Sequence, residues 1–231
     1  MRSLGPSVLL VLSAALSAAA CLNVPATAAP DQASPPAAER IPLPSPRLSG
    51  QLSLEEALAA RRSVREFEPA PLSLAQVGQL CWAAQGITSA SGGRTAPSAG
   101  ALHPLELYVL TGDGIFHYLP GPHALERLTH TDRRTALRAA AWDQEAVSQA
   151  PAVIAVTAVP QRTSAKYGPE RAERYVWLEA GHAAQNILLE AVALGLGAVP
   201  IGAFQDDAVR DVLDLPAATI PLYLVPVGHR G

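Results

Sequence analysis

The chain has 231 residues, of which 49% are hydrophobic and 16% are charged. That much apolar material can build a core and excludes an intrinsically disordered protein. The net charge is −3, so the chain lacks the basic surface typical of nucleic-acid-binding proteins. Eight of the 21 prolines lie in the first 50 positions, and none of the aromatic residues does, which predicts that the folded part starts near Gly50.

Residues 1–28 predict a secretory signal peptide. Arg2 precedes an apolar run over 8–20, and residues 26–28, Ala-Thr-Ala, fit the small-residue pattern of a cleavage site. In an alternative interpretation, the residues before Cys21 form a bacterial lipoprotein signal, and Cys21 becomes a lipidated N-terminus. We therefore expect an exported protein, periplasmic or extracytoplasmic, which contacts a membrane only if this cysteine is lipidated.

Residues 29–49 are rich in proline, alanine and serine, which predicts an extended linker before a single domain over residues 50–231. Apart from Cys21, the only cysteine is Cys81. An internal disulfide in the exported chain is therefore not expected. Cys81 lies next to Trp82 in a helical pattern, and core packing is its expected role.

Two capping boxes predict the first helices of the domain. One helix begins after Ser53 and ends near Arg61, because a glutamate follows the serine at the third position. A second begins after Ser73 and runs to Gln85, where Gly86 is expected to supply a left-handed cap.

The following segments mix strands with short helices. Residues 87–100 are small or polar and predict a loop, and 111–114 predict the turn of a hairpin. Strands are expected at 105–110, 115–119, 153–159 and 220–227, with 198–204 as strand or loop. Short helices are expected at 124–128, 133–140 and 207–213.

One long helix is expected from Arg171 to Leu194. Of the 19 residues from Val176 onward, 13 are apolar, which is too many for a helix buried on one face only. Polar residues interrupt it too often for a membrane span, so we expect burial on several sides, in the centre of a domain or of a dimer. Helices and strands do not alternate regularly, which predicts the α+β class.

Two short polar segments can carry chemistry. Residues 61–65, Arg-Arg-Ser-Val-Arg, can bind a phosphate through guanidinium groups and a hydroxyl; alternatively, they compensate the dipole of the preceding helix. Lys166 and Tyr167 can act as general base and acid if they are buried; alternatively, they are exposed on a loop. The six histidines lack the spacing of zinc ligands, so no metal site is expected.

The glycine-rich segment 195–203 differs from a dinucleotide-binding fingerprint, because it follows a helix and leads into a strand. A nicotinamide cofactor is therefore expected to visit the site as a transient substrate. The small residues of 95–104 allow a flat ligand to approach the backbone closely, or they form a simple connecting loop.

The order of several motifs along residues 50–231 resembles that of the nitroreductase superfamily, and most closely its SagB-type dehydrogenase branch. Those motifs are R-R-S-V-R, P-S-A-G-A-L-H-P, K-Y-G, R-Y-V-W-L-E-A-G-H-A-A-Q-N, G-A-V-P-I-G-A-F and V-G-H-R. Ordinary nitroreductases carry N-x-Q-P-W after the Pro-Ser step, whereas residues 101–105 here read A-L-H-P-L, which favours the dehydrogenase branch.

The resemblance implies an α+β fold with a mixed sheet flanked by helices. It also implies a homodimer, with FMN bound where the long helices of two subunits meet. The residues implied in FMN binding are Arg61, Ser63, Arg65 and Arg230 at the phosphate, with Arg62 as a further candidate; Pro97, Ser98, Ala99 and Gly100 beside the flavin from one subunit; Pro200, Ile201 and Gly202 along the isoalloxazine, with the Gly202 amide toward N5; and Gln185 nearby. Lys166 and Tyr167 match the pair that azoline-oxidising members use for proton removal.

The expected function is that of an exported FMN-dependent oxidoreductase that transfers a hydride, two electrons at a time, between the flavin and a small substrate. NAD(P)H is expected as a transient electron donor. One alternative is a flavin- or ligand-binding module that keeps the fold without turnover. Another is a structural lipoprotein, which would bind no flavin.

Overall fold

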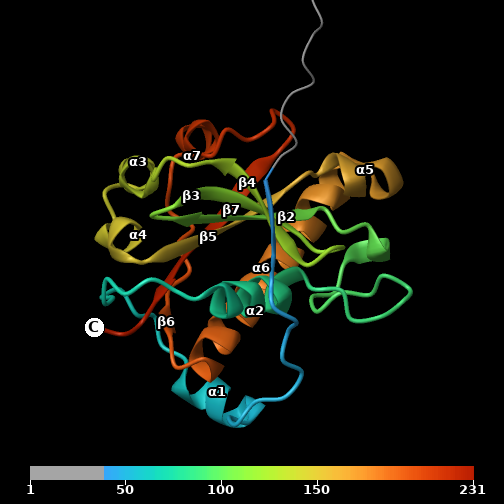
Figure 1. The fold of residues 1–231 in the computed structure, drawn as a ribbon. Coiled ribbons are helices and arrows are strands. Elements are labelled where there is room, and N and C mark those ends of the chain that lie inside the picture. Colours follow the sequence, from blue (N-terminus) through green and yellow to red (C-terminus); the bar gives the residue numbers. More distant parts are fainter. Residues whose placement is uncertain (1–38) are drawn as a thin grey trace, which may run out of the picture. The chain divides into compact units, whose positions relative to one another are not determined.

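Strand β5, Ala152–Ala158, is buried along its whole length and determines how the domain is layered. In the computed structural model, which describes residues 39–231, β5 lies inside a seven-stranded sheet of order β1-β4-β3-β2-β5-β7-β6 (Figure 1). The other strands are β1 Arg40–Pro42, β2 Leu105–Thr111, β3 Gly114–Leu119, β4 Ala124–Thr129, β6 Gly197–Ala198 and β7 Ile220–Gly228. All six pairings between these strands are antiparallel, and Ser63 adds one parallel bridge to Ala198 at the β6 edge.

Helices cover both faces of the sheet, because its central strands are apolar on both faces. On β2, Leu107 and Val109 pack with α2 and α6, while Tyr108 and Leu110 pack with α3, α4 and α7 on the other face. The helices are α1 Leu54–Ala60, α2 Leu74–Gln85, α3 Arg134–Ala140, α4 Glu145–Gln149, α5 Gln161–Tyr167, α6 Pro169–Ala193 and α7 Asp206–Val212. The α+β class is thus confirmed.

Helix α6 is the long helix expected from the sequence, and it spans the sheet beside α2 (Figure 1). Its buried face includes Val176, Ala183 and Ile187, none of which has measurable exposure. Burial of one such aliphatic side chain as large as isoleucine contributes about 1.5–3 kcal/mol. Another part of α6 is exposed, including Trp177 at 63% and Leu178 at 53%. Within residues 39–231 no helix is both long and apolar enough to cross a bilayer.

Both predicted capping boxes are present, at Ser53 and at Ser73. In each, the serine hydroxyl accepts a hydrogen bond from the backbone N–H three residues on, at 3.2 Å. The hairpin of β2 and β3 and the central position of β5 are also confirmed. The predicted signal peptide, including Cys21, lies outside the described residues.

Three predictions about local structure were wrong. Residues 124–128 are not helical but belong to β4, because they pair with β3 on one side and β1 on the other. Gly86 is not left-handed, with φ −64°; the position requires glycine because a Cβ would lie 2.1 Å from Trp82 Cδ1. The predicted linker ends too late, because Arg40–Pro42 form β1.

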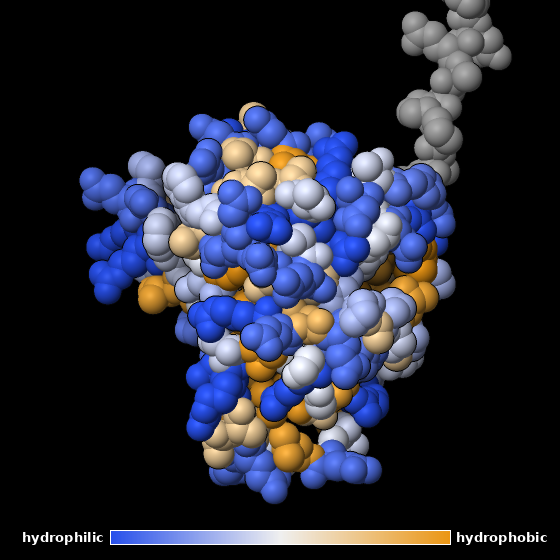
Figure 2. All heavy atoms as spheres, turned by 90° about the vertical axis from the view of Figure 1, so that its left-hand side faces the viewer, coloured by the Kyte–Doolittle hydropathy of each residue, from blue (hydrophilic) through white to orange (hydrophobic). Residues whose placement is uncertain are grey.

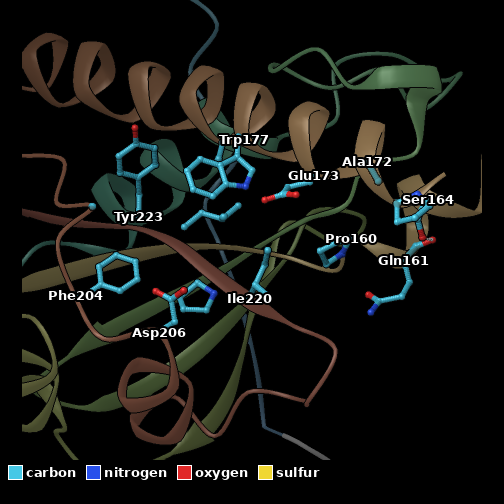
Figure 3. Close-up of a pocket in the computed structure, with 15 residues that line it drawn as sticks. Pro160, Gln161, Ser164, Ala172, Glu173, Trp177, Phe204, Asp206, Ile220 and Tyr223 are labelled. Carbon is cyan, nitrogen blue, oxygen red and sulfur yellow. Dashed lines mark hydrogen bonds between the residues drawn. The ribbon is translucent and has the colours of Figure 1, made fainter. Parts of the chain in front are cut away.

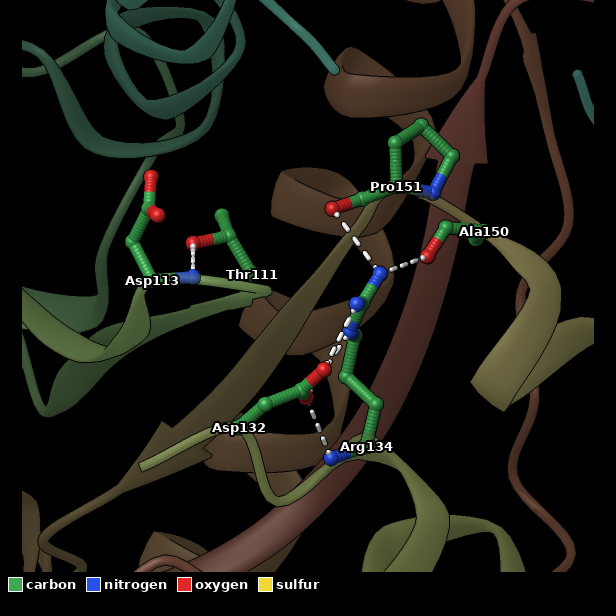
Figure 4. Close-up of polar contacts among 6 residues, drawn as sticks. All are labelled: Thr111, Asp113, Asp132, Arg134, Ala150 and Pro151. Atoms are coloured by element: carbon green, nitrogen blue, oxygen red, sulfur yellow. Dashed lines mark hydrogen bonds and ion pairs between the residues drawn. The ribbon is translucent and has the colours of Figure 1, made fainter. Parts of the chain in front are cut away.

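A salt bridge fixes the segment that leads into β5 (Figure 4). The Arg134 side chain donates two hydrogen bonds to Asp132, and it also donates to the Ala150 carbonyl at 2.8 Å and the Pro151 carbonyl at 3.3 Å. The hydrogen bonds from Arg134 lower the pKa of the Asp132 carboxyl. The start of α3 is thereby held against the start of the central strand.

We expect Gly114→Ala to destabilise the domain more than Gly121→Ala does. Gly114 has φ +125°, and a Cβ there would lie 1.9 Å from the Thr129 carbonyl oxygen, whereas nothing lies within 4 Å of a Cβ at Gly121. Backbone strain and this clash together should cost at least about 2 kcal/mol of unfolding free energy. Urea denaturation of the two variants measures the difference, and equal midpoints would contradict the described turn.

Candidate functional site

The Arg-Arg-Ser-Val-Arg segment follows α1 and runs beside β6. Ser63 forms a parallel bridge with Ala198, and the Val64 N–H donates to the Ala198 carbonyl at 3.0 Å. Gly197 permits this approach, because a Cβ there would lie 2.6 Å from Val64 Cγ1. Val64 is half-buried, while Ser63 and Arg65, on either side of it, are exposed. Alternation along extended backbone directs these two polar side chains to the same face.

The C-terminal residues join the same edge of the sheet. Phe67 forms an antiparallel bridge with Arg230, and the Glu68 N–H donates to the His229 carbonyl at 3.0 Å. Arg230 Nε donates to the Leu196 carbonyl at 3.4 Å. Residues that are more than 160 positions apart in sequence therefore meet at β6. We call Arg61, Ser63, Arg65 and Arg230 the arginine cluster.

The arginine cluster carries positive charge that the described residues do not neutralise. Among residues 39–231, no carboxylate forms an ion pair with Arg61, Arg65 or Arg230. Guanidinium groups beside a hydroxyl form a donor set that suits a phosphate. Arg62 points elsewhere, since its Nη1 donates to the Ala59 carbonyl at 2.9 Å and to the Arg61 carbonyl at 2.7 Å.

The Pro200-Ile201-Gly202 strip continues from β6 along β7. Ile201 exchanges two backbone hydrogen bonds with Leu224, at 2.8 and 2.9 Å. The next residue, Gly202, is exposed, and its N–H donates no hydrogen bond within residues 39–231. A free backbone donor with no side chain suits a flat ligand that packs against the strip.

Residues 97–103 form a strained loop that is held by α6. The Ala99 N–H donates to Glu179 Oε1 at 2.8 Å, and the His103 N–H donates to Ser98 Oγ at 2.9 Å. The φ angle is positive at Gly100, Ala101 and His103, at +63°, +54° and +46°. The latter two conformations are unfavourable for residues with a Cβ, and such strain is often found at ligand sites.

Lys166 and Tyr167 contact this loop. They lie at the end of helix α5, in a segment for which the sequence predicted no helix. A Cβ added to Gly100 would lie 2.7 Å from the Tyr167 hydroxyl and 2.9 Å from Lys166 Nζ. The Tyr167 ring also packs edge-to-face on Tyr175 of α6, with 5.1 Å between centroids. We call residues 97–100 with Lys166, Tyr167 and Glu179 the loop cluster.

Glu179 is a site residue that the sequence did not single out. Its side chain holds the strained loop, and the residue is only 4% exposed. Burial raises the pKa of its carboxyl, and the bonds from Ala99 and Ser98 oppose only part of that shift. On the sequence it is one of several polar residues in an apolar helix, with no signal of its partner 80 positions away. Gln185 lies exposed on the same helix, and its side chain forms no hydrogen bond among the described residues.

A cavity of about 580 Å³ opens between α5, α6, β7 and the segment before α7 (Figure 3). Its walls include Gly202 from the Pro200-Ile201-Gly202 strip, called the flat strip below, and Ser164 from α5. The cavity therefore connects the β6 edge with the helix that carries Lys166 and Tyr167. The described part of the chain contains no group of three metal-ligating side chains close enough to hold an ion.

Comparison with known proteins identifies this arrangement. The sequence profile of the Nitroreductase family matches residues 58–229, which include the loop cluster, the cavity and all of the arginine cluster except Arg230. The chain belongs to the nitroreductase family. The resemblance of its motifs to that superfamily is thereby confirmed.

Individual relatives agree with this assignment. A protein of Methanocaldococcus jannaschii named as a nitroreductase is 40% identical over 186 residues, which are 78% of this chain and 92% of that protein. A solved structure from Ralstonia eutropha, also named as a nitroreductase, has a TM-score of 0.76 at 32% identity and covers 83% of this chain and 90% of its own.

Two more distant matches are named for specific activities. The trifolitoxin-processing protein TfxB of Rhizobium leguminosarum is 30% identical over 137 residues, 53% of this chain but only 35% of that protein. The NADPH:FMN oxidoreductase of Vibrio harveyi, solved with NAD⁺, shares the fold with a TM-score of 0.58 at 23% identity, over 77% of this chain and 68% of its own.

We expect Glu179→Gln to become more stable relative to the parent chain as the pH rises. A carboxyl whose pKa is raised above 4.5 by folding stabilises the folded state below that pH and loses this contribution as it ionises. Glutamine does not titrate, and its amide oxygen can still accept the hydrogen bond from Ala99. Urea midpoints at about pH 4 and about pH 8 measure the change, with Glu170→Gln at the exposed start of α6 as the control. Parallel pH dependences in the parent and Glu179→Gln would refute a raised pKa.

Proposed function

We propose that the chain is an exported FMN-dependent oxidoreductase of the SagB-type dehydrogenase branch. It would transfer a hydride between FMN and a small substrate. The observation that carries the proposal is the arginine cluster, which has no carboxylate partner among residues 39–231 and lies at the same sheet edge as the free amide of Gly202. The arginine cluster would recognise the phosphate of FMN, and the backbone at Gly202 would recognise its flat ring.

The arginine cluster would bind the FMN phosphate through charge-assisted hydrogen bonds. The flat strip of Pro200, Ile201 and Gly202 would support the isoalloxazine, and the Gly202 N–H would donate to N5. Bound FMN supplies the redox chemistry, as an acceptor and donor of hydride. The residues of this chain bind the flavin, orient it and direct a hydrogen-bond donor to it.

A second copy of the chain would complete this site. The loop cluster is held against α6 by its own contacts, whereas the arginine cluster is held at the β6 edge. Exposed apolar side chains lie on the helices next to both regions, including Leu178 on α6 and Leu54 and Leu58 on α1, which are 51–61% exposed. Apolar surface is visible at the end of the molecule where α1 lies (Figure 2). Exposed apolar residues on two neighbouring helices support a homodimer interface.

Lys166 and Tyr167 would move protons during turnover. The basic nitrogen and the phenol approach the same glycine, Gly100, in the loop that would lie beside the flavin from the second subunit. The likeness to TfxB over half the chain supports a role related to the dehydrogenase branch. NADH or NADPH would visit as a transient donor, in agreement with the name of the Vibrio harveyi neighbour. Export rests on the predicted signal peptide, which lies outside the described residues.

We expect Arg61→Gln and Arg65→Gln each to weaken FMN binding by the full chain at least about tenfold, because each removes a charged hydrogen bond to the phosphate. Riboflavin lacks the phosphate, and its affinity should change less than about twofold. Fluorescence titration with both flavins measures the two effects. Arg40→Gln, at the opposite edge of the sheet, is the control. Equal losses for both flavins would mean that these arginines support the fold instead of the phosphate.

We expect the double variant Lys166→Met, Tyr167→Phe to retain FMN but to reduce a nitroarene with NADPH about a hundredfold more slowly. Nitro reduction consumes protons, and a positioned acid–base pair typically contributes 10²- to 10⁴-fold. Steady-state rates measured together with the flavin content per chain distinguish slower turnover from loss of FMN. If turnover survives both replacements, the proton-transfer role is wrong.

A further inference from the structure

The 580 Å³ cavity has walls that suit a flat ligand. Trp177 of α6, Phe204 of the segment before α7 and Tyr223 of β7 contribute three aromatic rings. Figure 3 shows Trp177 and Glu173 reaching into the cavity from α6, with Phe204 and Asp206 on the opposite side. Ile220 extends the apolar wall along β7. Aromatic rings stack on flat molecules in an offset geometry, and the negative charge of their faces attracts cations.

The charges at this cavity have one sign. Glu173 and Asp206 line it, and its fifteen lining residues include no lysine, arginine or histidine. Neither carboxylate forms an ion pair with any of residues 39–231. Both are therefore free to attract a ligand cation, so among ligands of the same shape the cavity favours a cation over an anion.

The cavity also adjoins the proposed flavin site. Gly202 belongs both to the flat strip and to the cavity wall, and a Cβ on it would lie 3.8 Å from Tyr223 Cε1. A molecule in the cavity would therefore lie next to the donor that is directed to the flavin. We infer that this cavity is the substrate site and that it selects flat aromatic molecules carrying a positive charge. The inference rests on the proposed function and adds a substrate class to it.

Three nitroarenes that differ mainly in charge test the selectivity of the full chain loaded with FMN. They are 4-nitrobenzyltrimethylammonium, 4-nitrobenzyl alcohol and 4-nitrophenylacetate. Each two-electron turnover oxidises one NADPH to NADP⁺, takes up one proton, and converts the nitro group to a nitroso group with release of one water. At low ionic strength we expect kcat/KM to fall in that order, with the cation favoured over the anion at least about tenfold, mainly through KM.

Matched variants show whether the two carboxylates cause this ranking. The double variant Glu173→Gln, Asp206→Asn should lower kcat/KM for the cation about tenfold and leave the neutral alcohol unchanged within about twofold. The control Glu170→Gln, Asp207→Asn removes two charges from the same two helices outside the cavity, and it should keep the ranking. Equal effects of the two double variants, or no ranking in the parent chain, would overturn the inference and leave the proposed function intact.

A binding measurement without turnover separates the inference from the proposed function. Benzyltrimethylammonium cannot be reduced, and we expect it to quench tryptophan fluorescence, whereas benzyl alcohol at the same concentration should quench less. Trp177→Phe should abolish the difference, and the Glu173, Asp206 double variant should weaken it. If the chain binds no FMN or reduces none of the nitroarenes while this quenching persists, the proposed function fails but the cation preference stands. If the quenching is absent or survives both changes, the cation preference fails.

Discussion

The candidate site depends on backbone pairing at one edge of the sheet. Residues 63 and 64 pair with Ala198 of β6, and residues 66–68 pair with the last three residues of the chain. Because Gly197 has no side chain, Val64 can pack directly on the backbone there. This packing brings arginines from both ends of the domain to one place, at the edge where β7 is paired with only two residues of β6. Because β6 is so short, the edge of the sheet is left open for residues 63–68 to pair there.

A second constraint comes from α6, which belongs to the core and to the site at once. Its buried face packs on the sheet, and its Glu179 reaches the strained loop at Ser98 and Ala99. The loop conformation costs free energy at Ala101 and His103. Burial of the Glu179 carboxyl group adds a further cost. Packing of α6 on the sheet fixes the position of Glu179, and this can stabilise both the strained loop and the buried carboxyl group. The exposed side of the same helix carries Trp177 toward the cavity.

Much of the fold could be predicted from the sequence, because its signals are local. The serine caps at residues 53 and 73, the apolar run of β5 and the hairpin turn each lie within a few residues of the structure that they determine. The helix predicted at residues 124–128 was wrong because the sequence Ala-Leu-Glu-Arg-Leu suits a helix as well as a strand. Only pairing with β1 and β3 decides between the two.

The site was less predictable from residue properties alone. Arg230 lies far in sequence from Arg61 and Arg65, and the loop at Gly100 lies far from Lys166, so only the family motifs indicated that these residues belong together. Glu179 was missed because its role depends on a loop 80 residues earlier. The cavity was missed for the same reason, since its aromatic rings come from three separate elements. Long-range contacts of this kind leave no periodic signal in a single sequence.

We propose that this edge of the sheet binds FMN and supports turnover. The most direct test is the visible absorption spectrum of the purified full chain after incubation with FMN and removal of the excess. We expect a retained flavin band, at about one flavin per chain, that NADH or NADPH bleaches in the absence of oxygen. A colourless protein after this treatment would mean that the arginine cluster does not bind the FMN phosphate, and the proposed function would be wrong.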